Sequence, residues 1–333
     1  TEQAAMNKPV LLKEIDAIGA GQVSAVRLCE GETVRIMTGA PIPDGADAVI
    51  PLELVQEQII GRERWISLSR RLKPGDNISR RGEDIQEGTV LLRRGRRIAA
   101  GEMALLATFG CTAVRVFARP TVGVFATGSE LVPLDEPLSP GKIRDSNSYM
   151  LLGQIHEAGA IARLYGILPD DYRLCLGEVR RALEEVDVLL VTGGVSVGDF
   201  DFMPKILKEL ECDVLFNKVA MRPGSVTTAA VKGKKWLFGL SGNPSACFVG
   251  FELFVRPLLM KMLGAEALFR PLSKARLTHD IRKANPFTRF IRARIDIDEG
   301  QVTVRKVGLD KSGAVSSLAG ANGLIVAPGG PKG

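Results

Sequence analysis

The stretch VDVLLVTGGVSVGDFDFMPKIL, residues 186–207, decides the fold class of this chain. Residues 188–191 are apolar on both alternating faces, which is typical of a central parallel strand that is covered on each side. Thr192 and a pair of glycines end this run, and a helical pattern of apolar residues begins at Phe202. In an open α/β sheet, ligands bind beyond the carboxyl ends of such strands. We therefore expect the chemistry of the chain to lie there.

Two further apolar runs end in the same way. Residues 122–126 lead into the sequence TGSE at 127–130, and residues 236–240 lead into SGNP at 241–244. A single glycine-rich loop is as often a plain tight turn as it is a binding site. Three predicted strands that all end in small hydroxyl residues and glycine favour one shared pocket over three independent turns.

Strands and helices alternate from residue 120 onward, which predicts a three-layer α/β domain. The predicted strands cover residues 121–127, 161–168, 188–191, 213–216 and 236–240. The predicted helices cover residues 146–158, 172–185 and 246–263, together with the helix that follows Phe202.

The regions on both sides of this domain are predicted to be rich in β-structure. Residues 7–92 contain short apolar runs separated by Pro and Gly, at 33–37, 48–51 and 65–68, and predict a small barrel or sandwich. Residues 99–110 predict a helix that Gly110 ends. Short strands are predicted after the α/β domain at residues 275–277, 290–297, 301–307 and 323–327.

At 333 residues the chain is too long for one ordinary core. We predict four parts. They are a β-rich domain over residues 1–92, a helical linker over 93–118, the α/β domain over 119–264, and a small C-terminal β-barrel-like domain over 265–333.

The composition predicts a cytoplasmic protein that binds small anions. Five scattered cysteines suit a reducing compartment better than a disulfide framework, and two histidines are too few for a His-based metal centre. No apolar stretch is long enough to span a bilayer, and the start shows no signal-peptide pattern. The net charge is +6, but aromatic residues are only 5% and do not interleave with the arginine clusters, so we expect no binding of nucleic acid.

Acidic residues follow the predicted strands at the proposed pocket. They are Glu130, Asp145, Asp170, Asp199 and Asp201. Two or more carboxylates beside a phosphate-binding loop are the usual way to hold Mg²⁺. We therefore expect Mg²⁺ as a cofactor.

Groups that bind anions lie in the same loops. Backbone N–H groups of Gly193, Gly194 and Gly242 suit an oxyanion, and Lys218 and Arg222 supply cations for a phosphate or another tetrahedral oxyanion. No side chain has the setting of a covalent nucleophile. The residues alone predict a Mg²⁺-dependent site for an anionic, phosphorylated ligand.

Nine motifs occur along the chain in a recognisable order. They are TGAPIPDGADAVI (38–50), GDNISRRGEDI (75–85), ATGSELV (126–132), GKIRDSNSYML (141–151), LPDD (168–171), TGGVSVGDFD (192–201), MRPGS (221–225), LSGNPSA (240–246) and SSLAGANGLIVAP (316–328). In this order they resemble the molybdopterin molybdenumtransferases, the MoeA family, to which the E domain of gephyrin also belongs. The resemblance runs over essentially the whole chain.

The resemblance implies an enzyme of molybdenum cofactor biosynthesis. Members use adenylylated molybdopterin, molybdate and Mg²⁺, insert the metal into the dithiolene and release AMP. They are homodimers, and their cleft lies between the α/β domain of one protomer and the β-rich domain of the other. The resemblance also implies the molybdopterin adenylyltransferase as a partner.

The resemblance assigns roles to individual residues. Asp201, Asp170 and Glu130 are the implied acidic residues of the cleft, and Asp201 and Glu130 the implied metal ligands. Thr38 and Asp84 are the implied contribution of the β-rich domain. The implied contacts to substrate are Gly193, Gly194, Ser196, Lys218, Arg222, Ser241, Gly242, Asn243, Pro244, Asp145, Ser146 and Asn147.

Two features depart from the family pattern. Members usually begin with a segment that contains a Ser-Ala-Met-Asp-Gly-Tyr-like motif, and nothing like it precedes Val10, so we expect that segment to be missing here. Members often carry Lys-Pro after the Pro-Gly pair at 223–224, where this chain has Ser225 and Val226. One anion-binding lysine is therefore absent.

Three alternatives remain at this level. The same α/β domain occurs in the molybdopterin adenylyltransferase and is compatible with a nucleotide pyrophosphatase, but the β-rich segments on both sides argue against a single-domain adenylyltransferase. A non-catalytic scaffold of the gephyrin type is the third alternative. The retained Asp201, Asp170 and Glu130 argue against it.

Overall fold

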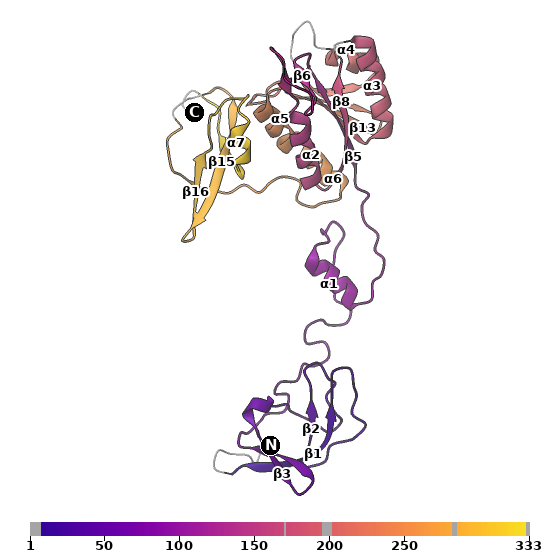
Figure 1. Cartoon of the computed structure of the whole chain (residues 1–333), viewed down its shortest axis with the longest axis vertical. Helices are drawn as coiled ribbons and strands as arrows, with labels where there is room; N and C mark the ends of the chain where they lie inside the picture. The colour runs from indigo at the N-terminus through magenta and orange to yellow at the C-terminus, as the bar shows by residue number, and fades with distance from the viewer. Residues whose placement is uncertain (1–7, 170, 195–201, 282–284, 331–333) are drawn as a thin grey trace. The chain divides into compact units, whose positions relative to one another are not determined.

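The structure is a computed structural model that describes residues 8–169, 171–194, 202–281 and 285–330. The chain forms two compact units, Thr1–Leu91 and Leu92–Gly333 (Figure 1). Among the helices of these described ranges, none is both long enough and apolar enough to cross a membrane.

The first unit contains one mixed four-stranded sheet with the order β2-β1-β4-β3. The strands are β1 (Val10–Ile18), β2 (Glu32–Ile36), β3 (Gln56–Ile60) and β4 (Glu63–Leu68), and a short helix, η1 (Leu52–Leu54), precedes β3. β1 pairs in parallel with β2 and antiparallel with β4. The described strands thus form a single open sheet, and the predicted barrel or sandwich is wrong for this part of the chain.

The apolar run at residues 48–51 forms no strand. Ala48 and Ile50 still pack on the small core around Leu68 and Leu72. Their neighbours bond to another loop, because the Val49 N–H donates to the carbonyl of Asp76 and the Gly75 N–H donates to that of Asp47. The apolar pattern at residues 48–51 therefore predicts the packing correctly and the strand wrongly. The backbone groups of this segment form hydrogen bonds with another loop instead of with a neighbouring strand.

The second unit begins with helix α1 (Ala100–Thr108), where the sequence predicts a helix over 99–110. The buried carboxylate of Glu102 accepts hydrogen bonds from the Ala99 N–H (3.0 Å) and from Arg96 (2.8 Å). These bonds satisfy a free N–H at the start of the helix. The hydrogen bond from Arg96 is the main reason that the pKa of Glu102 is lowered.

The α/β domain is built on a six-stranded sheet with the order β10-β12-β13-β9-β5-β8. Its strands are β5 (Thr121–Thr127), β8 (Ile161–Leu168), β9 (Val188–Thr192), β10 (Asp213–Phe216), β12 (Thr228–Lys232) and β13 (Lys235–Leu240). β8, β5, β9 and β13 run parallel, and β12 runs antiparallel to both of its neighbours. The five predicted strands are all present, and β12 is an additional one.

Helices cover both faces of this sheet (Figure 1). α2 (Asn147–Glu157) and the continuous run of α5 (Pro244–Gly250), the π-helix η2 (Phe251–Val255) and α6 (Arg256–Met262) pack on one face. α3 (Tyr172–Glu185) and α4 (Met203–Glu209) pack on the other. Val188 and Leu190 of β9 enter the first core, Leu189 and Val191 enter the second, and all four are fully buried. This alternation confirms the predicted three-layer fold.

The C-terminal part is a curled sheet around the long strand β15 (Thr288–Asp298). β16 (Gln301–Lys306) and β17 (Gly323–Ala327) pair with it, and β14 (Arg276–Leu277) pairs with β16. The helix α7 (Ser316–Ala319) precedes β17. β11 (Met221–Arg222), which belongs to a loop of the α/β domain, pairs in parallel with the start of β15. The four predicted short strands are all found, and the sheet fits the predicted barrel-like domain.

Candidate functional site

The three glycine-rich strand ends meet at one edge of the sheet. Thr192 closes β9 and lies opposite Ala126 of β5 on one side and Leu240 of β13 on the other. Thr127 and Ser241 follow these partners directly, and the Gly193 N–H donates to the carbonyl of Leu240 at 3.0 Å. The edge where these three strands end, with the loops that follow them, is called the strand-end site below.

Asn147 ties two of these loops together from the start of α2. Its Nδ2 donates to Thr192 Oγ1 at 2.9 Å and to the Gly242 carbonyl at 2.8 Å. Thr192 Oγ1 in turn donates to the carbonyl of Ser241 at 3.1 Å. The buried amide of Asn147 therefore ties the loop at residues 192–194 (the TGG loop) to the loop at residues 241–244 (the SGNP loop). The start of α2 and these two loops lie far apart in the sequence.

At the strand-end site and at the start of α2, which bonds to it, three buried polar atoms have no hydrogen-bond partner among the described residues: Thr127 Oγ1, Asn147 Oδ1 and Ser148 Oγ. Buried polar groups in folded proteins are nearly always paired, and an unpaired one is costly. Several unpaired buried polar atoms close together indicate a site that a polar ligand or ordered water completes.

The TGG loop depends on glycine at position 193. Gly193 has a φ of +88°, and a side-chain carbon built there would meet the carbonyl oxygen of Thr127 and lie 2.8 Å from its hydroxyl oxygen. Gly194 is also left-handed and equally close to that hydroxyl. The loop therefore approaches the end of β5 with its backbone rather than with side chains. Because the Gly193 N–H is already bonded to the Leu240 carbonyl, the Gly194 N–H is the one of this predicted pair that can meet an anion.

Two of the predicted acidic residues flank a small parallel sheet formed by β6 (Leu131–Val132) and β7 (Ile143–Arg144). Glu130 precedes β6 and is exposed, with its carboxylate close to Gly128. Asp145 follows β7, is buried, and accepts the Ser148 N–H at 3.0 Å. Asp145 thus supplies the hydrogen bond expected at the start of α2, and Ser146 beside it is exposed.

Four predicted acidic or hydroxyl residues lie outside the described residues: Asp170, Ser196, Asp199 and Asp201. Within the described ranges, no group of three or more His, Cys, Asp and Glu side chains gathers in a way that would hold a metal ion. Glu130 is the described member of the predicted metal pair, and its carboxylate oxygens are donors of the type that Mg²⁺ prefers. The predicted metal site stays a prediction.

The predicted cations follow the edge strand β10. Lys218 is exposed. Arg222 lies in β11 and is also exposed, and the loop after it packs against α5, since a side chain at Gly224 would lie 3.2 Å from the carbonyl of Ala246. The structure thus brings the loop that follows Arg222 to the helix α5, which begins at Pro244.

Thr38 and Asp84, the predicted contribution of the β-rich domain, both lie in exposed loops of the first unit. Their role at the site stays a prediction.

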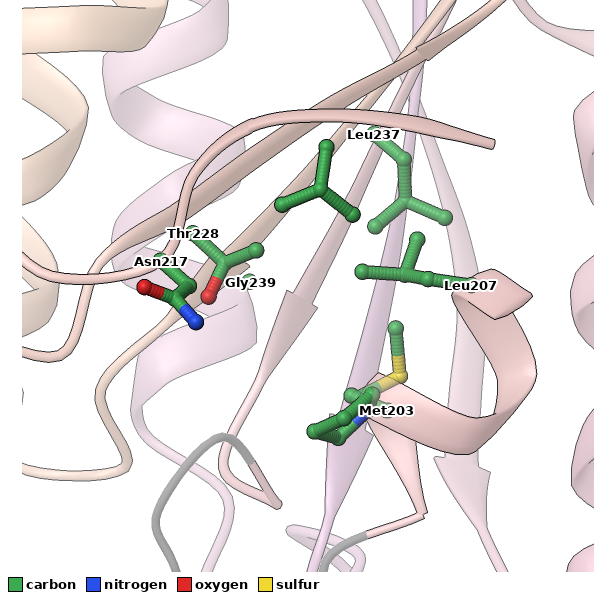
Figure 2. Close-up of a pocket in the computed structure, with 8 residues that line it drawn as sticks. Met203, Leu207, Asn217, Thr228, Leu237 and Gly239 are labelled. Carbon is green, nitrogen blue, oxygen red and sulfur yellow. The ribbon is translucent and has the colours of Figure 1, made fainter. Parts of the chain in front are cut away.

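A cavity of about 100 Å³ lies at the same edge, between α4 and the strands β10, β12 and β13. Figure 2 shows Leu207 and Leu237 on one side of it and the polar Asn217 and Thr228 on the other. Sequence reasoning missed both polar residues. The only sequence signal for Asn217 was its position directly before the predicted Lys218. Thr228 had none, because it begins β12, the strand that the sequence did not predict.

The C-terminal domain also holds the SGNP loop, through the residue that follows it. Ser245, which follows Pro244, donates through its N–H to the Ser312 carbonyl (2.9 Å) and through its hydroxyl to the Ala314 carbonyl (2.8 Å). Arg292 holds the start of this partner loop through the carbonyls of Leu309 and Lys311. The guanidinium is almost fully buried, and burial lowers its pKa.

Cys247 lies below the strand-end site, fully buried, with its thiol hydrogen-bonded to Thr192. Burial raises the pKa of this thiol to about 12. At pH 8 only about one molecule in ten thousand carries the reactive thiolate there.

We expect iodoacetamide at pH 8 to alkylate the exposed Cys29 and Cys111 in the native protein and to reach Cys247 only after unfolding. Mass spectrometry checks this, and alkylation of Cys247 at the rate of Cys29 would contradict it.

Three family profiles match the chain in order. The MoeA N-terminal region (domain I and II) matches residues 1–110, the probable molybdopterin binding domain matches residues 123–261, and the MoeA C-terminal region (domain IV) matches residues 274–333.

Similar proteins extend over nearly the whole chain. A molybdopterin molybdenumtransferase of Bacillus subtilis is 52% identical over 333 residues, which are 100% of this chain and 77% of the relative. A molybdopterin molybdenumtransferase of Staphylococcus epidermidis is 48% identical over 319 residues, which are 96% of this chain and 75% of the relative. The crystal structure of the molybdopterin biosynthesis MoeA protein of Pyrococcus horikoshii OT3 is similar with a TM-score of 0.79 at 33% identity, over 99% of this chain and 80% of that one.

Proposed function

Since the chain belongs to the molybdopterin molybdenumtransferase family, we propose that it inserts molybdenum into adenylylated molybdopterin and releases AMP, as a transferase of molybdenum cofactor biosynthesis. One observation carries this proposal beyond family membership. The strand-end site, with the start of α2 that bonds to it, combines glycine backbone with three buried polar atoms that have no partner among the described residues. Such a site is built for a polar, anionic ligand.

The described residues act by positioning and electrostatics. The backbone N–H of Gly194 binds an oxyanion of the substrate, and Lys218 and Arg222 place molybdate or phosphate by charge. Asn147 fixes the two loops relative to each other through its bonds to Thr192 and Gly242. Preorganised groups of this kind need little rearrangement during the reaction, which is where their catalytic effect originates.

Mg²⁺ is part of the proposal. Glu130 would hold it, together with Asp201, which lies outside the described residues. When bound, the ion would neutralise charge on the pyrophosphate of the adenylylated pterin. The carboxylate donors favour a hard, oxygen-binding cation over a thiophilic metal.

We also propose the assembly and setting that the family resemblance implies. The protein is a cytoplasmic homodimer, in which Thr38 and Asp84 of one protomer complete the site of the other, and the molybdopterin adenylyltransferase is its partner. We expect neither nucleic acid nor membranes to be partners.

The rival function is that of an adenylyltransferase, which shares the α/β domain. Two parallel reactions separate the two activities. One contains molybdopterin and ATP with Mg²⁺, and the other contains adenylylated molybdopterin and molybdate with Mg²⁺. We expect AMP in the second reaction and no pyrophosphate in the first. Pyrophosphate released in the first reaction, without AMP in the second, would overturn the proposal.

A further inference from the structure

Arg222 lies where the α/β domain and the C-terminal domain share a β-pairing. In the parallel pair of β11 and β15, Met221 lies opposite Thr288 and Arg222 lies opposite Arg289. Phe287 directly precedes this pair in the C-terminal domain. The guanidinium carbon of Arg222 lies 5.5 Å from the centroid of the Phe287 ring, within the range of a cation–π contact. Its Nη1 donates to Ser225 Oγ at 3.4 Å.

Both ends of this contact are fixed by the backbone. The Phe287 N–H donates to Asn285 Oδ1 at 3.0 Å, and Asn285 pairs with Gly330 in an isolated bridge. On the other side, the Thr227 hydroxyl donates to the carbonyl of Gly224 at 2.8 Å, which closes the loop after Arg222. The ring and the loop are therefore held independently of the arginine side chain that joins them.

The charge of Arg222 has no counterion among the described residues. In contrast, Arg289 pairs with Asp310, and Arg292 lies 3.9 Å from the same carboxylate. A cation–π contact does not use the N–H groups of a guanidinium as hydrogen-bond donors to another side chain. Apart from the bond from Nη1 to Ser225, the N–H groups of Arg222 therefore stay available to a ligand. Those N–H groups are the ones that bind a tetrahedral oxyanion.

We propose that Phe287 is a positioning residue for the reaction, with Ser225 in a smaller supporting role. It holds the Arg222 guanidinium in the orientation that binds the oxyanion of a substrate, and so makes the C-terminal domain part of the substrate site. A side chain that is already ordered loses less conformational freedom when the anion binds. This inference rests on the proposed function, since it takes Arg222 as an anion-binding residue.

The test compares Phe287→Leu with Phe287→Tyr, which keeps the aromatic face, and with Phe269→Leu as the matched control at an exposed position. The rate of AMP release is measured against molybdate and against adenylylated molybdopterin in turn. Phe287→Leu is expected to raise the half-saturating concentration of one of them about two- to fivefold with kcat unchanged. Phe287→Tyr and Phe269→Leu are expected to match the wild type. The substrate whose half-saturating concentration shifts is the one that Arg222 binds.

A double-mutant cycle separates positioning from a general effect on the fold. In an Arg222→Met background, Phe287→Leu is expected to cause no further shift, because the group that it positions is gone. An equal shift in both backgrounds, or no shift in the wild-type background, overturns the inference. Dissociation constants from calorimetry give the same comparison without turnover. A wild type that binds these anions but releases no AMP would therefore contradict the proposed function and still decide the role of Phe287.

Discussion

Replacement of Gly193 by alanine is expected to lower kcat/KM about a hundredfold while the protein stays folded. The added carbon would meet the Thr127 carbonyl oxygen, which belongs to the end of a central strand and has little room to move. The φ of +88° is also unfavourable for any residue with a side chain. The TGG loop must therefore shift, and the Gly194 N–H leaves the position from which the proposed function has it bind the substrate.

The matched control is Gly233→Ala. Gly233 has a φ of +59° in the turn between β12 and β13, and nothing lies within 4 Å of a carbon added there. Alanine at position 233 has the same unfavourable left-handed φ, but its added carbon clashes with no other atom. Steady-state rates of AMP release and circular dichroism spectra are compared for both variants. A Gly193→Ala enzyme within a few-fold of Gly233→Ala would contradict the role assigned to the TGG loop.

Replacement of Arg292 by methionine is expected to lower the local free energy of unfolding of the C-terminal domain by about 2–4 kcal/mol. The change removes the buried hydrogen bond to Ser317 Oγ, which measures 2.9 Å, and the two part-buried bonds to the carbonyls of Leu309 and Lys311. The freed loop includes Ser312 and Ala314, so the SGNP loop loses a support as well.

Hydrogen exchange of the amides in β15 and β17 measures this effect locally, which is preferable because a chain of several domains does not unfold in two states. The control is Arg294→Met on the same strand, where the arginine is exposed and pairs with Asp296. Exposed ion pairs contribute about 0–1 kcal/mol. Equal protection of the amides in both variants would show that the buried network does not hold the domain.

The layers of the α/β domain could be predicted because burial on both faces leaves a direct trace in the sequence. Residues 188–191 are apolar without alternation, and the structure buries them on two sides. The strand β12 could not be predicted in this way. Its sequence TAAVK is short and rich in alanine, a residue with low strand propensity. The ladders of β10 and β13 on either side of it supply the bonds that make it a strand.

The candidate site could be predicted only in part for a related reason. Strand ends with glycine and hydroxyl residues located the edge of the sheet, because parallel strands finish on one side. The hydrogen bonds between Asn147 and Gly242, and the contact of Phe287 with Arg222, join residues that are tens of positions apart. No local pattern marks such partners, since they are chosen by the tertiary fold.

The most direct test of the proposed function is the rate of AMP release from adenylylated molybdopterin and Mg²⁺ as a function of molybdate concentration. We expect release that rises with molybdate and saturates, because the proposed function gives the oxyanion its own cationic subsite at Lys218 and Arg222. Release at the same rate without molybdate would contradict the account and identify the protein as a nucleotide pyrophosphatase.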